Sequence, residues 1–114
     1  MSCQDFSVVQ GETATLLGHV VSNDSDVDMT GGSVLWATAA NVIVKSTTLA
    51  TITWINQATG WFQIELSVAD IATFTTAKGA STKHECWVKT AAGQVARIWD
   101  GQITTEAPSV TPIV

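Results

Sequence analysis

The sequence predicts a single all-β domain, an immunoglobulin-like antiparallel β-sandwich of about 7–8 strands with one short helical turn. Nearly every segment is rich in Thr, Val, Ile and Trp, residues that favour a pleated, half-buried surface. Turn residues interrupt these segments roughly every 8–12 residues, the spacing typical of sandwiches. The 114-residue length is that of one domain. A barrel with the same number of strands is the alternative.

The first half of the chain alternates short strands with polar turns. The predicted strands cover residues 5–9, 13–22, 33–39, 42–48 and 51–55. The last two are expected to pair with each other as a hairpin. The polar run 23–28 is predicted to be a loop.

The second half contains the clearest strand, 60–66, because Phe62, Ile64 and Leu66 alternate with more polar neighbours. Ser67 and Asp70 then have the spacing of a capping box, which predicts one or two helical turns over 67–72. The last two strands are predicted at 82–90 and 95–104.

The sandwich is expected to span 1–105, followed by an extended arm over 106–114. Pro108 and Pro112 lie in this arm, and proline interrupts both helices and strand ladders.

Composition and charge narrow the classes of partner. The chain is 46% hydrophobic and only 13% charged, which suits a subunit packed against neighbours. Its net charge is −5 and its five Lys and Arg are scattered singly, so nucleic acid is not an expected partner. With neither a signal-peptide pattern nor a membrane-length apolar run, we expect synthesis in a host cytoplasm and no membrane partner.

The antibody version of the sandwich requires a Cys on the second strand, a Trp on the third and a Cys on the sixth. Trp36 and Cys86 fit two of these positions, but the second strand has no Cys. The two cysteines, Cys3 and Cys86, form no C-x-x-C motif and are expected to be reduced thiols. An intermolecular disulfide through Cys3 is the alternative.

Catalytic and metal-binding patterns are weak. The sequence has no nucleophile elbow, phosphate loop or H-E-x-x-H motif, so we expect neither an enzyme nor a bound cofactor. His84 and Cys86 share a strand face, and with His19 they could hold zinc. The simpler interpretation places Cys86 in the core and His84 at a strand end.

Three alternating carboxylates, Asp24, Asp26 and Asp28, resemble the first calcium ligands of an EF-hand. The glycine and glutamate positions of that motif are Met29 and Leu35, so a solvated acidic turn is favoured over a looser calcium site.

Five tryptophans are the most informative side chains. Trp36 and Trp54 have inward phases and are predicted core residues. Trp61 and Trp87 have outward phases, as anchors for a partner protein do. A sugar platform, or cover by the chain's own loops, is the alternative. The phase of Trp99 is ambiguous because Gly101 could mark a bulge.

The run from Asp28 to Trp36 is similar to a D-L-T-G motif that opens the third strand in a family of phage tail domains. The segments 6–13, 60–70, 85–89 and 101–104 are similar to that family's opening, middle and closing strands. Together these segments resemble the immunoglobulin-like N-terminal domain of phage baseplate upper proteins.

This resemblance implies a structural subunit of a phage virion that docks on other virion proteins and on copies of itself. The tail or baseplate is the expected place, and a capsid or neck decoration protein or a host-glycan-binding module is the alternative. Trp-bearing faces and the arm are the expected contact surfaces. The candidate interface residues are Trp61, Trp87, Trp99, Pro108, Val110, Pro112 and Ile113.

Overall fold

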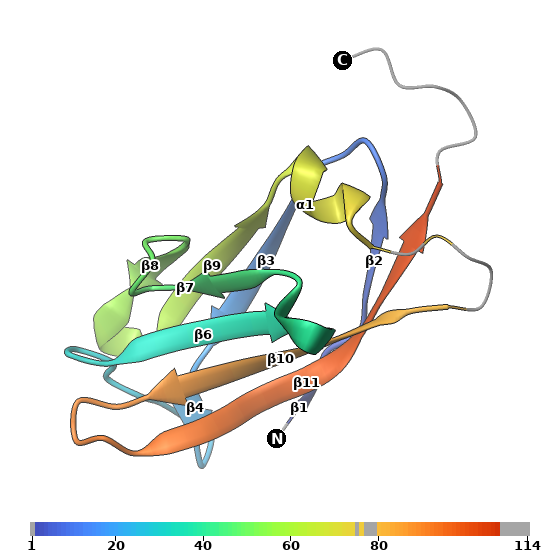
Figure 1. The fold of residues 1–114 in the computed structure, drawn as a ribbon. Coiled ribbons are helices and arrows are strands. Elements are labelled where there is room, and N and C mark those ends of the chain that lie inside the picture. The colour runs from blue at the N-terminus through green and yellow to red at the C-terminus, as the bar shows by residue number, and fades with distance from the viewer. Residues whose placement is uncertain (1, 75, 77–79, 108–114) are drawn as a thin grey trace.

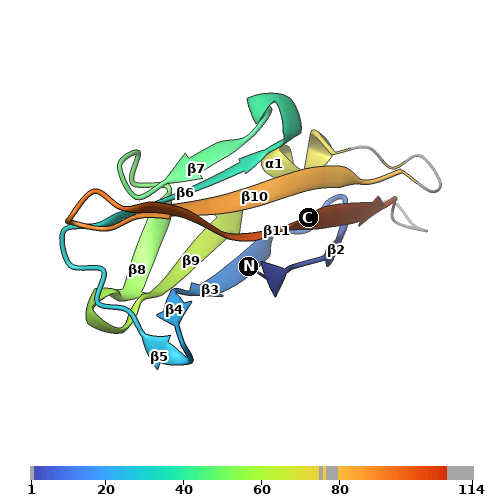
Figure 2. The ribbon, with the colours of Figure 1, turned by 90° about the horizontal axis from the view of Figure 1, so that it is seen from below.

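The protein folds as a two-layer β-sandwich, which confirms the predicted class (Figure 1). The computed structural model describes residues 2–74, 76 and 80–107. Six strands form the large sheet: β1 (Ser2–Cys3), β2 (Phe6–Val9), β6 (Ser33–Thr38), β7 (Val44–Ser46), β10 (Thr82–Lys89) and β11 (Val95–Glu106). Three form the small sheet: β3 (Ala14–His19), β8 (Ile52–Asn56) and β9 (Trp61–Leu66). Figure 2 shows the two layers from below.

Short elements connect the strands of the two sheets. They are the hairpin β4 (Val21–Ser22) and β5 (Ser25–Asp26), two 3-10 turns at Ala39–Asn41 and Gln57–Thr59, and α1 (Val68–Ala72). Ser67 and Asp70 form the predicted capping box at the start of α1. None of the described helices is long and apolar enough to cross a membrane.

The large sheet has the order β1-β11-β10-β6-β7, and β2 also pairs with β11. β1 and β2 run parallel to β11, whereas the other pairs are antiparallel. The chain kinks between β1 and β2 where it crosses Gly101, and the Gln4 amide donates to the Asp100 carbonyl at 2.8 Å. A Cβ on Gly101 would overlap the Gln4 carbonyl oxygen, so this crossing requires glycine.

The predicted hairpin of 42–48 with 51–55 is wrong. β7 pairs with β6 in the large sheet, and β8 pairs with β9 in the small sheet. The Thr51 amide still donates to the Ser46 carbonyl at 2.9 Å, but the chain then crosses from one layer to the other. Both segments were strand-like, and the local pattern could not tell which partner each would choose.

The predicted strand 13–22 and loop 23–28 are also corrected. The strand breaks at Val20, and the polar run contributes β5, which pairs with β4. Asn23 and Asp24 have φ values of 51° and 62°, as a two-residue hairpin turn requires. Asn and Asp tolerate this left-handed backbone better than most residues do.

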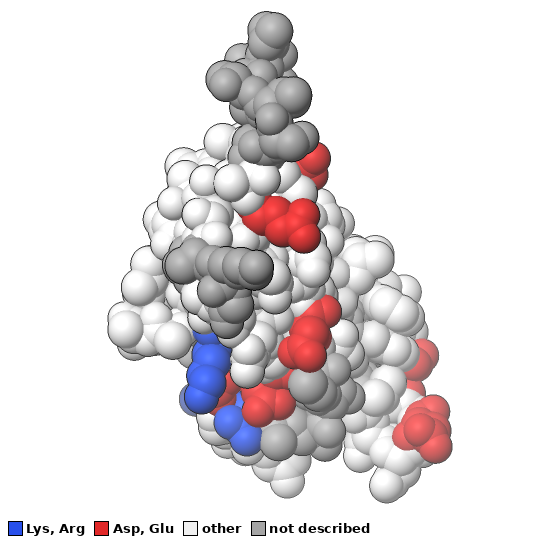
Figure 3. Space-filling view, turned by 90° about the vertical axis from the view of Figure 1, so that its right-hand side faces the viewer, with Lys and Arg blue, Asp and Glu red and all other residues white. Residues whose placement is uncertain are grey.

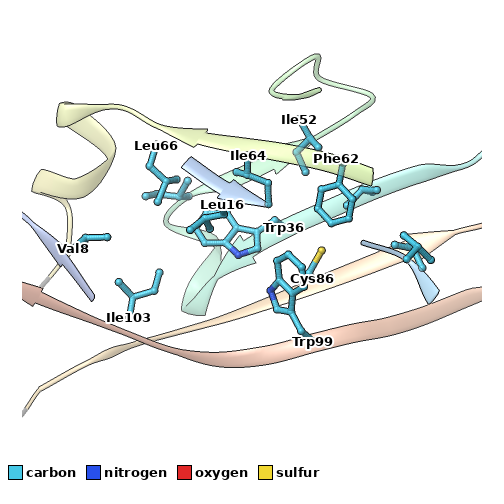
Figure 4. Close-up of a cluster of buried hydrophobic side chains, with 14 of the residues drawn as sticks. Val8, Leu16, Trp36, Ile52, Phe62, Ile64, Leu66, Cys86, Trp99 and Ile103 are labelled. Atoms are coloured by element: carbon cyan, nitrogen blue, oxygen red, sulfur yellow. The ribbon is translucent and has the colours of Figure 1, made fainter. Parts of the chain in front are cut away.

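The core lies between the sheets and is centred on Trp36, which is fully buried (Figure 4). Phe62, Ile64 and Leu66 point into it from β9, as predicted, and Trp54 packs partly buried at its margin. The Phe62 ring covers Gly18 of β3 so closely that any Cβ there would overlap it. The absence of a side chain at Gly18 in β3 therefore leaves the space that the Phe62 ring occupies.

Candidate protein interface

The outward face of the large sheet carries an apolar surface around Trp87. Leu35 lies opposite Trp87 in the ladder, and Val44 continues the same face beyond Ala37. Trp87 is 39% exposed and Leu35 is 42% exposed, whereas the alternating neighbours Cys86 and Val88 are buried. The predicted outward phase of Trp87 is thus confirmed. We call Leu35, Ala37, Val44 and Trp87 the Trp87 face.

An ion pair borders the Trp87 face. The Arg97 guanidinium lies 5.9 Å from the centre of the Trp87 ring. Its Nη1 donates to Glu85 Oε2 at 2.8 Å, and this hydrogen bond is the main reason that the pKa of Arg97 is raised. The pair places a polar rim beside exposed apolar side chains, the arrangement found in protein interfaces.

A groove of about 290 Å³ is lined in part by the Trp87 face and extends toward the C-terminal end of β6 and the N-terminal end of β10. Its walls come from those strands and from the 3-10 turn after β6. The lining residues are Leu35, Ala37, Thr38, Ala39, Ala40, Asn41, Lys83, His84, Glu85 and Trp87. Sequence reasoning missed Leu35 and Val44 as interface candidates. Their signal was apolar character on the outward phase of strands whose inward phase is also apolar.

Trp61 lies on a separate surface, the outward side of the small sheet. It is 40% exposed, as its phase predicts, and its ring stacks on His19 with centroids 4.0 Å apart. His19 Nε2 lies 2.9 Å from Asp26 Oδ1 and 3.0 Å from the Thr59 carbonyl oxygen. These contacts fix the orientation of the stacked pair. The structure does not bring Trp61 and Trp87 onto one face.

Trp99 is wrong as an interface candidate because it is 4% exposed and belongs to the core. The register between β10 and β11 shifts so that Trp87 pairs with Arg97 and Cys86 pairs with Trp99. Ile98 is therefore the extra residue, and the bulge does not lie at Gly101. The shift turns Trp99 inward, where its ring stacks on Phe62 with centroids 5.7 Å apart.

The remaining interface candidates, Pro108, Val110, Pro112 and Ile113, lie outside the described residues. Glu106, the expected first residue of the arm, is instead the last residue of β11 and pairs with Val9.

No protein-family model and no curated protein matches the sequence. Solved structures do match the fold. A chain in the crystal structure of ICOS in complex with ICOS-L and an anti ICOS-L VNAR domain matches with a TM-score of 0.54 and 13% identity. The match covers 93% of this chain and 56% of that chain. The chain has an immunoglobulin-like fold. It spans little more than half the length of the first structure that it matches.

Two further matches are to extracellular proteins. Drosophila OTK extracellular domains 3–5 match with a TM-score of 0.46 and 10% identity, over 89% of this chain and 31% of that one. The extracellular domain of the voltage-gated sodium channel beta4 subunit, solved as parallel homodimers, matches with a TM-score of 0.41 and 10% identity. That match covers 91% of this chain and 92% of the other.

In this immunoglobulin-like domain, Cys86 is a free, buried thiol. Burial raises the pKa of Cys86, which keeps the thiol protonated and unreactive. The core position predicted for Cys86 is confirmed.

His84 is a buried structural residue in the domain, not a residue at a strand end as predicted. Trp36 Nε1 donates to His84 Nδ1 at 3.0 Å, so Nδ1 carries no proton. His84 Nε2 then donates to the Gln4 carbonyl oxygen at 2.6 Å. The imidazole joins the core tryptophan to the kink between β1 and β2.

The zinc and calcium alternatives find no support in the geometry. Among residues 2–74, 76 and 80–107, no group of three His, Cys, Asp or Glu is placed to hold a metal ion. Asp26 instead contacts His19, and Asp28 accepts from the Thr30 hydroxyl at 2.6 Å. That hydrogen bond is the main reason for the lowered pKa of Asp28.

Acidification is expected to destabilise the domain through His84. Burial lowers the pKa of His84 below its ordinary value of 6.5, although the Gln4 carbonyl and the charges of Asp5 and Asp100 oppose the shift. The unfolded chain therefore binds the proton more readily. Stability is full above pH 6.5 and falls as the pH drops toward the lowered folded pKa, by at most about 1.4 kcal/mol per pH unit for one proton.

Urea unfolding at about pH 7.5 and about pH 5 measures this loss. The loss is expected to be smaller in His84→Gln, which cannot take up the proton, and to persist in the control His19→Gln. An equal loss in wild type and His84→Gln would contradict the role of His84.

Proposed function

We propose that this immunoglobulin-like domain is a non-enzymatic binding domain that docks on a partner protein through the Trp87 face. The observation that carries the proposal is a half-exposed tryptophan that lies opposite Leu35 in the ladder, with Val44 exposed further along the same face. Exposed indoles with apolar neighbours and a polar rim are the usual centres of binding energy in interfaces. The strand ladder holds them in place, so little ordering cost accompanies binding.

The side chains best suited to chemistry serve the fold instead. His84 bridges Trp36 and the Gln4 carbonyl, and Cys86 is a buried thiol with a raised pKa. His19 is held between Trp61 and Asp26. These contacts support a binding function over a catalytic one.

Our finer proposal is that the domain is a structural subunit of a phage virion, associated with the tail or baseplate. The sequence resemblance to baseplate upper proteins supports it, as does the low content of charged residues. The partners would be neighbouring virion proteins. On the side drawn in Figure 3, acidic side chains are dispersed and Lys and Arg form no broad cluster, which favours a protein over a nucleic-acid partner.

Incorporation into phage particles tests both proposals. We expect the wild-type chain, supplied to a phage that lacks its own copy, to appear in purified particles at a fixed copy number by mass spectrometry. Trp87→Ala is expected to weaken docking by about 30-fold, since loss of a central aromatic anchor costs about 2 kcal/mol or more. Leu49→Ala, which alters a 60%-exposed side chain between β7 and β8, is the control and should incorporate normally.

Each outcome has a separate meaning. Absence of the wild-type chain from particles would contradict the virion role. Normal incorporation of Trp87→Ala would contradict the Trp87 face as the docking surface. A change in intrinsic tryptophan fluorescence on adding host polysaccharide to the isolated domain would instead favour the glycan-binding alternative.

A further inference from the structure

The outer edge of β3 is an unprotected strand edge. Among the described strands, β3 pairs on one side only, with β9. Its six residues stay in continuous register from Ala14 opposite Leu66 to His19 opposite Trp61, without a bulge. The strand contains no Asp, Glu, Lys, Arg or Pro. It therefore lacks the charges, prolines and bulges that normally keep an edge from pairing with another chain.

The other described edges are interrupted or short. β8, at the opposite edge of the small sheet, has a register shift between Trp54 and Asn56. β7 is three residues long, β2 is four and β1 is two. The part of β11 before its pairing with β1 contains the bulge at Ile98. Bulges and short strands disfavour edge-to-edge pairing, so β3 is the edge best able to accept a new strand.

The edge of β3 is left open because the two N-terminal strands pair elsewhere. β1 and β2 both pair with β11 of the large sheet. No described strand is left to cover β3, although its main-chain groups continue an ordered ladder. Such an edge favours addition of an extended strand from another molecule.

The exposed side chains of β3 suit pairing of the strand with itself. Leu17 is 61% exposed near the middle of the strand, on the same face as Thr15 and His19. An antiparallel pair centred on Leu17 places the two Leu17 side chains opposite each other and Thr15 opposite His19. Gln63, the ladder partner of Leu17, would flank each end of the central row, so this row contains no charge.

We propose that two copies of the domain associate through β3 by a two-fold axis that passes beside Leu17. The pairing joins two three-stranded small sheets into one six-stranded sheet. Charge opposes a second copy less at this edge than it would at an acidic surface. The chain carries a net charge of −5, which opposes self-association through acidic surfaces, whereas β3 has no carboxylate. The Trp87 face lies on the other sheet and stays free in the dimer.

Sedimentation velocity over about 1 to 200 µM tests the proposal, since weak edge pairing is expected in this range. We expect reversible dimerisation of the full chain. Leu17→Lys, which brings two like charges together, should raise the dissociation constant at least about tenfold. Leu49→Lys makes the same change at an equally exposed site away from β3 and should dimerise like wild type.

A cysteine cross-link tests the register. In a Cys3→Ser background, oxidised Leu17→Cys is expected to form a covalent dimer, because directly opposite Cβ atoms lie about 4.5–5.5 Å apart. Leu49→Cys is the matched control and should cross-link far less.

Three results would overturn the proposal: a wild-type chain that is monomeric throughout this range, a dimer that Leu17→Lys leaves intact, or equal cross-linking of the two cysteine variants. Trp87→Ala separates this proposal from the docking function, because it should leave the dimer unchanged. Loss of the dimer in Trp87→Ala would move self-association to the Trp87 face and refute pairing through β3.

Discussion

Replacing Trp36 with alanine is expected to reduce the free energy of unfolding by about 3–5 kcal/mol, the cost of removing a large buried aromatic side chain. Trp36 is fully buried between the sheets and pairs with Cys86 in the ladder, so the cavity would open at the centre of the domain. His84 Nδ1 would also lose the indole N–H that it accepts from. An unpaired buried acceptor adds to the loss.

Urea denaturation measures the effect, and Trp36→Phe separates its two causes. Phenylalanine retains most of the apolar volume but donates no hydrogen bond, so we expect a smaller loss of about 1–2 kcal/mol. The His84 ring nitrogen resonances should shift in Trp36→Phe because the bond to Nδ1 is gone. A loss below about 1 kcal/mol in Trp36→Ala would show that the core does not depend on this residue.

Period-two alternation explains why so much of the sandwich could be predicted. In β9 and β10, alternate side chains enter the core while Trp61 and Trp87 face outward, and both phases were read correctly from the sequence. The capping box of α1 was equally local, since Ser67 and Asp70 satisfy each other's backbone amides within one turn.

Pairing and phase across an irregularity could not be predicted. No sequence signal near Ile98 predicts a bulge. This one extra residue nevertheless reverses the phase of the strand, so Trp99 faces the core and not the surface. Likewise, the local sequence of β7 and β8 is typical of a hairpin. The two strands nevertheless belong to different sheets, because β7 pairs with β6 and β8 pairs with β9. These outcomes depend on distant contacts that local pattern does not encode.

The Trp87 face illustrates the same limit for function. Trp87 was recognisable from its phase, but the ladder between β10, β6 and β7 was needed to place Leu35 opposite it and Val44 on the same face. The partners of His84 were also distant in sequence, since Trp36 reaches it from β6 and Gln4 from the link between β1 and β2.

Replacing Gly101 with alanine is expected to release the N-terminal strand and to cost about 2–4 kcal/mol, from steric overlap and lost hydrogen bonds. The new Cβ would overlap the Gln4 carbonyl oxygen and carbon, which are main-chain atoms that cannot rotate away. Moving Gln4 breaks its bonds to the Asp100 carbonyl and to His84 Nε2. The bond from the Gln102 amide to Asp5 Oδ1 depends on the same kink.

Gly93→Ala is the control that separates crowding from backbone strain. Gly93 has a φ of +91° and open space around it, so alanine there should cost only about 1 kcal/mol and leave the N-terminus in place. Hydrogen exchange is expected to show lost amide protection around Gln4 and Gln102 in Gly101→Ala alone. If both variants retain that protection, the N-terminal strand does not depend on the close approach at Gly101. In that case the hydrogen bond from His84 Nε2 to the Gln4 carbonyl oxygen should still link the N-terminal segment to Trp36.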